Sequence, residues 1–140
     1  MGASLNNSSD PCFTFFGQRP NEVIKRLREK KVSPGNGTRL ALIIEGGGMR
    51  SIVAGGMLVA LHKLGLTSIF DVIYGSSAGA VTGAYFLSRQ IPYGISMYYE
   101  ELNNRKFVYI YRAPPVIKID YLMEVIMNKK KLDVAAVHDS

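Results

Sequence analysis

Two short, mainly apolar runs along the chain each lead into a glycine-containing loop and then into an apolar segment of helix length. The first run covers residues 40–44 and the second covers residues 69–74. Both have the length of strands, and continuous apolar runs of this kind are typical of strands in a parallel sheet that is covered on both faces. The pattern therefore predicts two buried parallel strands.

The segments between and after these runs predict two helices. Residues 52–64 are apolar nearly all round and precede Gly65, which is suited to the end of a helix. Residues 78–88 form the second apolar segment. Strand, helix, strand and helix in this order make a βαβα unit, so the predicted fold class is α/β with a parallel-sheet core covered by helices.

A break at residues 33–37, Ser-Pro-Gly-Asn-Gly, separates this core from the start of the chain. We expect residues 1–38 to be a polar N-terminal extension with a short basic helix over 21–31, which begins after Pro20 and has a narrow apolar face. Residues 39–140 then form the domain proper.

Beyond Gln90 the hydrophobic pattern is weaker. It predicts helices over 95–103 and 120–127 and a strand over 107–111. The residues after that last helix read as a polar tail.

The composition is that of a globular chain. Its 140 residues are 47% hydrophobic and 20% charged, which suits one domain with a buried core. No uncharged apolar stretch approaches the roughly 20 residues that cross a bilayer. The single cysteine, Cys12, excludes an internal disulfide, and residues 1–10 do not resemble a secretory signal. We therefore expect a cytoplasmic protein that is not secreted.

The formal net charge of +6 is concentrated in residues 25–31 and 129–131. Neither run is interleaved with aromatic residues, so a nucleic-acid partner is not expected. The runs are either solvated helix faces or a peripheral contact with an anionic membrane surface. The sequence does not indicate an oligomeric state.

The first chemical motif is the pentapeptide Gly75-Ser76-Ser77-Ala78-Gly79. It lies between a predicted strand and a predicted helix, the context in which G-x-S-x-G forms a nucleophile elbow. Ser77 is then the candidate catalytic nucleophile, Gly75 and Gly79 leave room for the tight turn, and Ser76 points elsewhere. The alternative is a turn of small residues that lets a helix pack close to the sheet.

The second motif is Gly46-Gly47-Gly48-Met49-Arg50, which follows the first predicted strand. Consecutive glycines leave backbone N–H groups free to face an anion, and the next helix favours negative charge there. Either a phosphate cradle or an oxyanion hole fits. A P-loop is excluded because no Gly-Lys-Ser/Thr follows. Arg50 is either a cation at this site or an ordinary surface arginine.

The two motifs follow consecutive parallel strands, so we expect them side by side at one edge of the sheet. One supplies a hydroxyl nucleophile and the other supplies hydrogen-bond donors. Hydrolysis of an acyl ester needs both.

Residues 42–50 and 75–80 together resemble the patatin-like phospholipase family, closely over residues 40–90 and more loosely over 119–122. That family hydrolyses phospholipid and acylglycerol esters on a parallel-sheet α/β fold, which implies a lipid ester substrate and a role in lipid degradation. The resemblance implies Ser77 as nucleophile without a cofactor or metal. It also implies an oxyanion hole formed and supported by Gly46, Gly47, Gly48, Arg50 and Ala78.

The sequence departs from the family pattern in two places. Ser51 stands where the glycine-rich motif ends in glycine. The family also pairs its serine with an aspartate in an Asp-Gly-Gly or Asp-Gly-Ala motif, and no aspartate here precedes a glycine: the five are Asp10, Asp71, Asp120, Asp133 and Asp139. We therefore expect residues 39–140 to be the N-terminal portion of a patatin-like domain that lacks this aspartate.

Three other interpretations remain open. A Ser-Asp-His triad of Ser77, Asp120 or Asp133, and His138 has an allowed order, but His138 lies in the expected polar tail. Alternatively, the chain is a catalytically silent fragment or pseudoenzyme that binds lipid or a protein partner. A phosphate-binding module built on the glycine loop is the weakest alternative.

Overall fold

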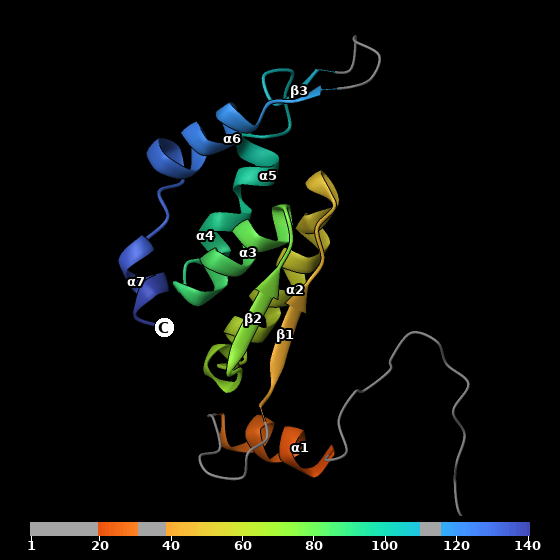
Figure 1. The fold of residues 1–140 in the computed structure, drawn as a ribbon, viewed down its shortest axis with the longest axis vertical. Helices are drawn as coiled ribbons and strands as arrows, with labels where there is room; N and C mark the ends of the chain where they lie inside the picture. Colours follow the sequence, from red (N-terminus) through yellow and green to blue (C-terminus); the bar gives the residue numbers. More distant parts are fainter. Residues whose placement is uncertain (1–19, 31–38, 110–115) are drawn as a thin grey trace, which may run out of the picture.

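Two parallel strands, β1 (Ala41–Ile44) and β2 (Val72–Gly75), form the centre of the domain. Their register places Ala41 opposite Val72 and Ile44 opposite Gly75. The helix α2 (Ser51–Lys63) connects the strands and α3 (Ala78–Leu87) follows β2. Both helices lie behind the strands in Figure 1. The predicted α/β fold with a parallel βαβα core is confirmed.

The computed structural model describes residues 20–30, 39–109 and 116–140. The other elements within these ranges are α1 (Pro20–Glu29), η1 (Gly48–Arg50), η2 (Thr67–Ile69), α4 (Ile91–Ile95), α5 (Met97–Glu100), β3 (Val108–Tyr109), β4 (Val116–Ile117), α6 (Ile119–Glu124), the π-helical turn η3 (Val125–Lys129) and α7 (Val134–His138). The strands β3 and β4 pair in antiparallel orientation. Cys12 and Lys31 lie outside the described residues.

The core gathers around α3. Tyr85 and Phe86 on this helix are fully buried and pack with residues of the surrounding helices. Gly55 on α2 allows close packing, because a Cβ atom there would lie 2.1 Å from Cδ1 of Ile95. The neighbouring Gly56 faces open space.

One face of the two-stranded sheet is open. Side chains alternate between the two faces of a strand, and Ile44 is buried whereas Ile43 is 78% exposed. Tyr74, opposite Ile43 in the register, is 59% exposed. The prediction that both faces are covered is therefore wrong for the described part of the chain, where α2 and α3 cover a single face.

The helix α1 forms where predicted, but with a different face inward. Ile24 and Leu27, members of the expected apolar face, are 46% and 40% exposed, whereas the Arg26 side chain is 1% exposed. Its guanidinium donates to the Ile69 carbonyl oxygen at 3.2 Å and pairs with the Asp71 carboxylate. Arg26 therefore belongs to the packing of α1 below the strands in Figure 1, not to a solvated basic face.

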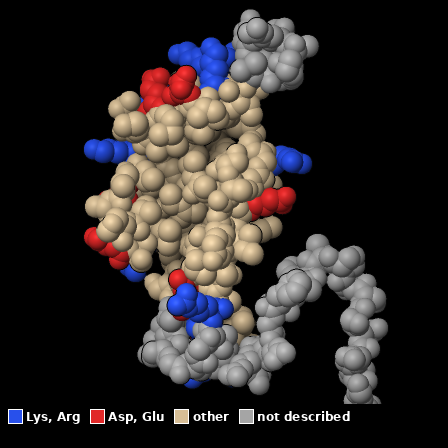
Figure 2. Space-filling view, viewed as in Figure 1, with Lys and Arg blue, Asp and Glu red and all other residues tan. Residues whose placement is uncertain are grey.

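The second basic run is partly neutralised within the molecule. Lys129 lies 2.7 Å from a carboxylate oxygen of Glu101, and Lys130 pairs with Glu100. Figure 2 shows positive side chains spread over the visible face, several with carboxylates beside them, rather than one continuous basic patch. Within the described ranges, no helix combines the length and apolar character needed to cross a bilayer.

The region after residue 90 is more finely divided than the pattern predicted. The expected helix over 95–103 is replaced by the short helices α4 and α5, and the one over 120–127 becomes α6 followed by a π-helical turn. The expected polar tail contains α7. Of the predicted 107–111 strand, residues 107–109 lie within the described part of the chain, and Val108 and Tyr109 form β3.

Candidate functional site

The turn between β2 and α3 holds Ser77 in a strained backbone conformation. Its φ of 49° and ψ of −125° lie in a region that residues other than glycine rarely adopt. Such a conformation costs on the order of 1–3 kcal/mol and concentrates at active sites. Ser77 is exposed and occupies the N-cap of α3, yet its side chain makes no capping hydrogen bond. The hydroxyl is thus not used for the structural task that serine usually performs at a helix start.

The glycines on either side of Ser77 are required by close backbone packing. A Cβ atom on Gly79 would lie 2.4 Å from the Ile44 carbonyl oxygen, and one on Gly75 would lie 2.6 Å from Cα of Ala80. Gly79 therefore lets α3 start directly against the end of β1. The elbow and the glycine loop meet at one edge of the sheet, as expected from the order of the motifs.

The glycine loop after β1 approaches the elbow through Gly46. The Gly46 N–H donates to Oγ of Ser76 at 3.0 Å, and a Cβ on Gly46 would lie 2.8 Å from the Ser76 carbonyl oxygen. Gly47 and Gly48 have φ values of 143° and 58°. Among the described residues, no hydrogen-bond acceptor is found for the N–H groups of these two glycines. The Gly46 amide is engaged within the protein, whereas those of Gly47 and Gly48 remain available to a ligand.

Sequence reasoning missed the role of Ser76, which was expected to point elsewhere. Ser76 is the second residue of the G-x-S-x-G motif, where any residue type is allowed. Its local sequence therefore does not indicate a contact with a residue 30 positions away in the chain. Only the folded turn shows that this hydroxyl meets the glycine loop.

Arg50 lies at the start of α2 and is exposed. A Cβ on Gly47 would lie 3.5 Å from Nε and 3.6 Å from a terminal nitrogen of this arginine. The guanidinium is therefore folded against the glycine loop. This places a positive charge beside the loop amides, which favours an anion there.

Two buried hydroxyls support the first turn of α3. Thr82 Oγ1 donates to the Ala78 carbonyl oxygen at 2.9 Å and lies 3.0 Å from the Tyr98 hydroxyl. Burial raises the pKa of Tyr98, so this phenol stays neutral and keeps its hydrogen bond at physiological pH. The hydroxyls of Thr82 and Tyr98, on the core side of α3, thus stabilise the position of Ala78, the residue after the candidate nucleophile.

A small apolar hollow of about 20 Å³ lies beside the two motifs. Its lining combines one residue of each motif with apolar and aromatic side chains from α3 onward: Gly48, Ala78, Val81, Met97, Tyr98, Leu102, Phe107 and Leu122. The hollow is lined mainly by apolar groups and has room for about one water-sized group.

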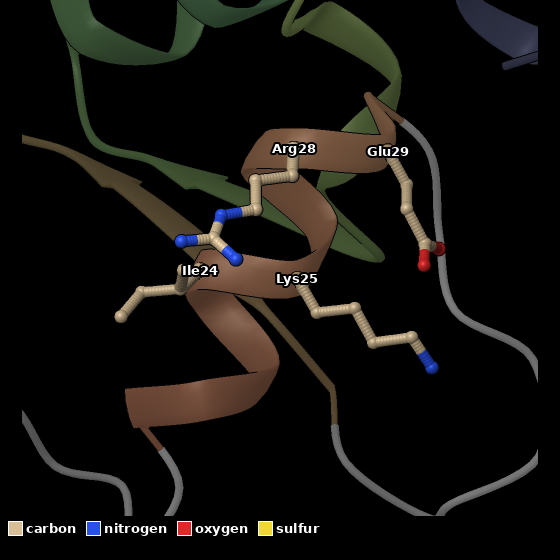
Figure 3. Close-up of a pocket in the computed structure, with 4 residues that line it drawn as sticks. All are labelled: Ile24, Lys25, Arg28 and Glu29. Atoms are coloured by element: carbon tan, nitrogen blue, oxygen red, sulfur yellow. The ribbon is translucent and has the colours of Figure 1, made fainter.

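A larger surface hollow, of about 440 Å³, lies on α1 and is separate from this site. Figure 3 shows the described residues that line it, Ile24, Lys25, Arg28 and Glu29, which lie on α1. Because α1 contacts the residues before β2 and Ser77 follows β2, the hollow lies at the other end of the strand from the candidate nucleophile.

No general base contacts the candidate nucleophile in the part of the chain that the structure describes, since no hydrogen bond to Ser77 Oγ is formed there. Asp71 is paired with Arg26, and Asp133 caps α7 through the Ala136 N–H. The His138 side chain is 90% exposed with Asp139 at 3.8 Å, and among the described residues no hydrogen bond or ion pair links it to Ser77. In the described ranges, no three potential metal ligands come together.

Comparisons with known proteins agree with these motifs. A family model described as patatin-like phospholipase matches residues 42–138. The uncharacterized protein YjjU of Escherichia coli (strain K12) is 27% identical over an alignment of 122 residues, and the match covers 85% of this chain. This chain spans about a third (34%) of the length of that relative. No solved structure matches.

Proposed function

Because the chain belongs to the patatin-like phospholipase family, we propose that it carries the nucleophile and the oxyanion-binding loop of a serine acyl-ester hydrolase. The substrates are phospholipid or acylglycerol esters. The observation that carries the proposal is the strained backbone of Ser77, whose hydroxyl caps no helix N–H and stands beside the glycine loop. A turn with only a packing role has no need of a serine in this conformation.

In the proposed reaction, Ser77 Oγ attacks the ester carbonyl carbon as its proton passes to a base. The negative charge on the carbonyl oxygen is stabilised by the N–H groups of Gly47, Gly48 and Ala78, with Arg50 beside the loop. The alcohol portion of the lipid then leaves, and water hydrolyses the acyl-serine ester. The hollow beside Gly48 and Ala78 has room for about one methylene-sized group, so the apolar residues that line it contact only the part of the acyl chain next to the carbonyl carbon.

The base is the part of this mechanism that the described residues do not supply. A serine hydroxyl without a base is a poor nucleophile near neutral pH. A small carboxylate added to the solution can therefore replace the missing group if the elbow and the oxyanion loop are otherwise competent.

The proposal is tested by incubating the purified chain with a fluorophosphonate probe, with and without added acetate. We expect labelling at Ser77 that rises with acetate concentration and is absent in Ser77→Ala. Ser68→Ala is the matched control, because Ser68 is an exposed serine outside the site, and it labels normally. Absence of labelling at every acetate concentration would overturn the proposal.

A second candidate function is a catalytically silent module that contacts an anionic membrane surface. The observation in its favour is that no base reaches Ser77 within the described residues, while Lys25 and Arg28 on α1 remain exposed. This function predicts co-sedimentation with phosphatidylserine vesicles that weakens with salt. It also predicts that Ser77→Ala binds the vesicles as the unaltered chain does.

A further inference from the structure

We propose that Ser76 is a positioning residue that holds the glycine loop against the nucleophile elbow and leaves the oxyanion role to Gly47 and Gly48. The inference rests on the proposed function and deepens it. It concerns the residue immediately before Ser77, whose side chain makes a contact that G-x-S-x-G alone does not specify.

The contacts of Ser76 join three parts of the site. Its hydroxyl accepts the Gly46 N–H at 3.0 Å, and its own N–H donates to the Ile44 carbonyl oxygen at 3.3 Å. Its carbonyl oxygen accepts the Gly79 N–H at 2.8 Å. One residue therefore contacts the end of β1, the glycine loop and the first turn of α3. The hydroxyl bond is the only one of the three that a side-chain substitution removes.

Close packing at the same point shows that the bond has a fixed geometry. A Cβ on Gly46 would lie 2.8 Å from the Ser76 carbonyl oxygen and 3.1 Å from Cβ of Ser77. The backbone of the glycine loop therefore packs directly against the elbow. The hydrogen bond from Gly46 to Ser76 fixes the orientation of the Gly46 peptide group at this contact. Gly47 and Gly48 follow at positive φ, so the direction of their N–H groups depends on how Gly46 is anchored.

The hydrogen bond also separates the three glycine amides by role. The Gly46 N–H is directed at Ser76 and does not face a substrate. The N–H groups of Gly47 and Gly48 have no acceptor within the described residues, and they are the loop donors that a developing oxyanion can meet. Loss of the Ser76 hydroxyl releases the Gly46 amide and allows the loop to rotate.

Ser76 is exposed, so water can replace its hydroxyl in part. Removing an oxyanion donor itself typically costs a hundredfold or more in rate, and loosening the loop that carries the donors should cost less, on the order of tenfold. The effect should fall on the chemical step and not on probe binding, since Ser76 does not line the apolar hollow.

The experiment measures the rate of fluorophosphonate labelling against probe concentration, with acetate present, to separate the maximal rate (kinact) from the half-saturating concentration (KI). For Ser76→Ala we expect kinact to fall about tenfold with KI within about twofold. Ser76→Thr keeps a hydroxyl and restores kinact to within about threefold, and the exposed control Ser68→Ala leaves both values unchanged. A Ser76→Ala variant that labels like the unaltered chain overturns the inference while the proposed function stands. An unlabelled chain overturns the proposed function, and the inference with it.

Amide exchange measured by NMR supplies a readout that is independent of labelling. The Gly46 N–H should be protected in the unaltered chain and in Ser76→Thr, and should exchange about tenfold faster in Ser76→Ala. Equal protection in all three would mean that the hydroxyl does not hold the loop. A uniform rise in exchange across the core would instead indicate general destabilisation and would also count against the inference.

Discussion

The guanidinium of Arg26 on α1 pairs with the carboxylate of Asp71, the residue that directly precedes β2. The same carboxylate accepts the Leu40 N–H at 2.6 Å, just before β1. A single ion pair thus ties the N-terminal helix to the amino ends of both strands, opposite the end that carries Ser77. The Arg26 side chain is 1% exposed and the Asp71 side chain 19%, so the cation is buried while the carboxylate lies at the edge of the contact, within reach of water.

Replacing Arg26 with alanine should destabilise the fold. The change removes the cation hydrogen-bonded to Asp71 and empties a buried position. Breaking a fully buried pair costs about 3–5 kcal/mol, and because the Asp71 carboxylate is partly exposed we expect a loss of about 2 kcal/mol. Urea unfolding followed by circular dichroism measures the loss. Arg28→Ala is the control, because Arg28 is exposed on the same helix, and a loss of equal size in both variants would contradict this account.

The stability should depend on pH through Asp71. Burial acts to raise the pKa of this carboxyl, but the Leu40 N–H and the Arg26 guanidinium outweigh it and hold the pKa below its usual 3.8. A lowered folded-state pKa contributes stability above the unfolded-state value, and that contribution is lost as the pH falls through the folded value. The free energy of unfolding should therefore drop from about pH 5 downward.

The matching measurement compares urea unfolding of the unaltered chain and of Asp71→Asn between about pH 7 and pH 3. We expect a shallower dependence in Asp71→Asn than in the control Asp120→Asn, which alters an exposed carboxylate and leaves the Arg26–Asp71 pair in place. Parallel curves for all three proteins would show that Asp71 is not the titrating group.

Gly79→Ala should disturb the elbow, whereas Gly56→Ala should not. A Cβ on Gly79 meets backbone oxygens of Ile44 and Glu45 at 2.4 and 2.7 Å, and such overpacking costs about 2–3 kcal/mol. Gly56 faces open space on α2, where alanine stabilises a helix by up to about 1 kcal/mol. Thermal unfolding should show opposite shifts, and a melting temperature for Gly79→Ala at or above that of the unaltered chain would refute the packing argument.

Tyr98→Phe should cost about 1 kcal/mol, because it removes a buried hydroxyl that lies 3.0 Å from Thr82 Oγ1. Thr82 keeps its bond to the Ala78 carbonyl oxygen, so the loss stays moderate. Tyr99 is 58% exposed, and Tyr99→Phe serves as the matched control with an expected change near zero. Equal free energies of unfolding for the two variants would argue against a supporting role for the buried hydroxyls.

The local pattern of apolar and small residues was sufficient to predict the strands and helices around the candidate site. The apolar runs, their lengths and the small-residue loops predicted β1, α2, β2 and α3 in order, because each signal lies within a few neighbouring residues. The same local signals carried the family resemblance, and the family match over residues 42–138 agrees with it. The assignment of Ser77 as nucleophile remains a prediction.

Contacts between distant parts of the chain were beyond the reach of these patterns. From the sequence, Arg26 is one of several cations in a predicted basic helix. It becomes a buried ion-pair partner only because α1 approaches Asp71, which lies 45 residues away in the chain. Ile43 reads as a buried strand residue, yet it is exposed because no described element packs on that face. The hydroxyl of Ser76 is likewise ambiguous until the glycine loop is folded onto it.

The sequence by itself therefore determined which segments are strands and helices, where the two glycine-bearing loops fall and to which family the chain is similar. The tertiary structure decided which side of each element is buried, the left-handed backbone of Ser77 and which glycine amide is already bonded. The physical reason is that periodicity and turn chemistry act over a few residues. Burial, ion pairing and backbone strain depend on partners that folding brings from tens of residues away.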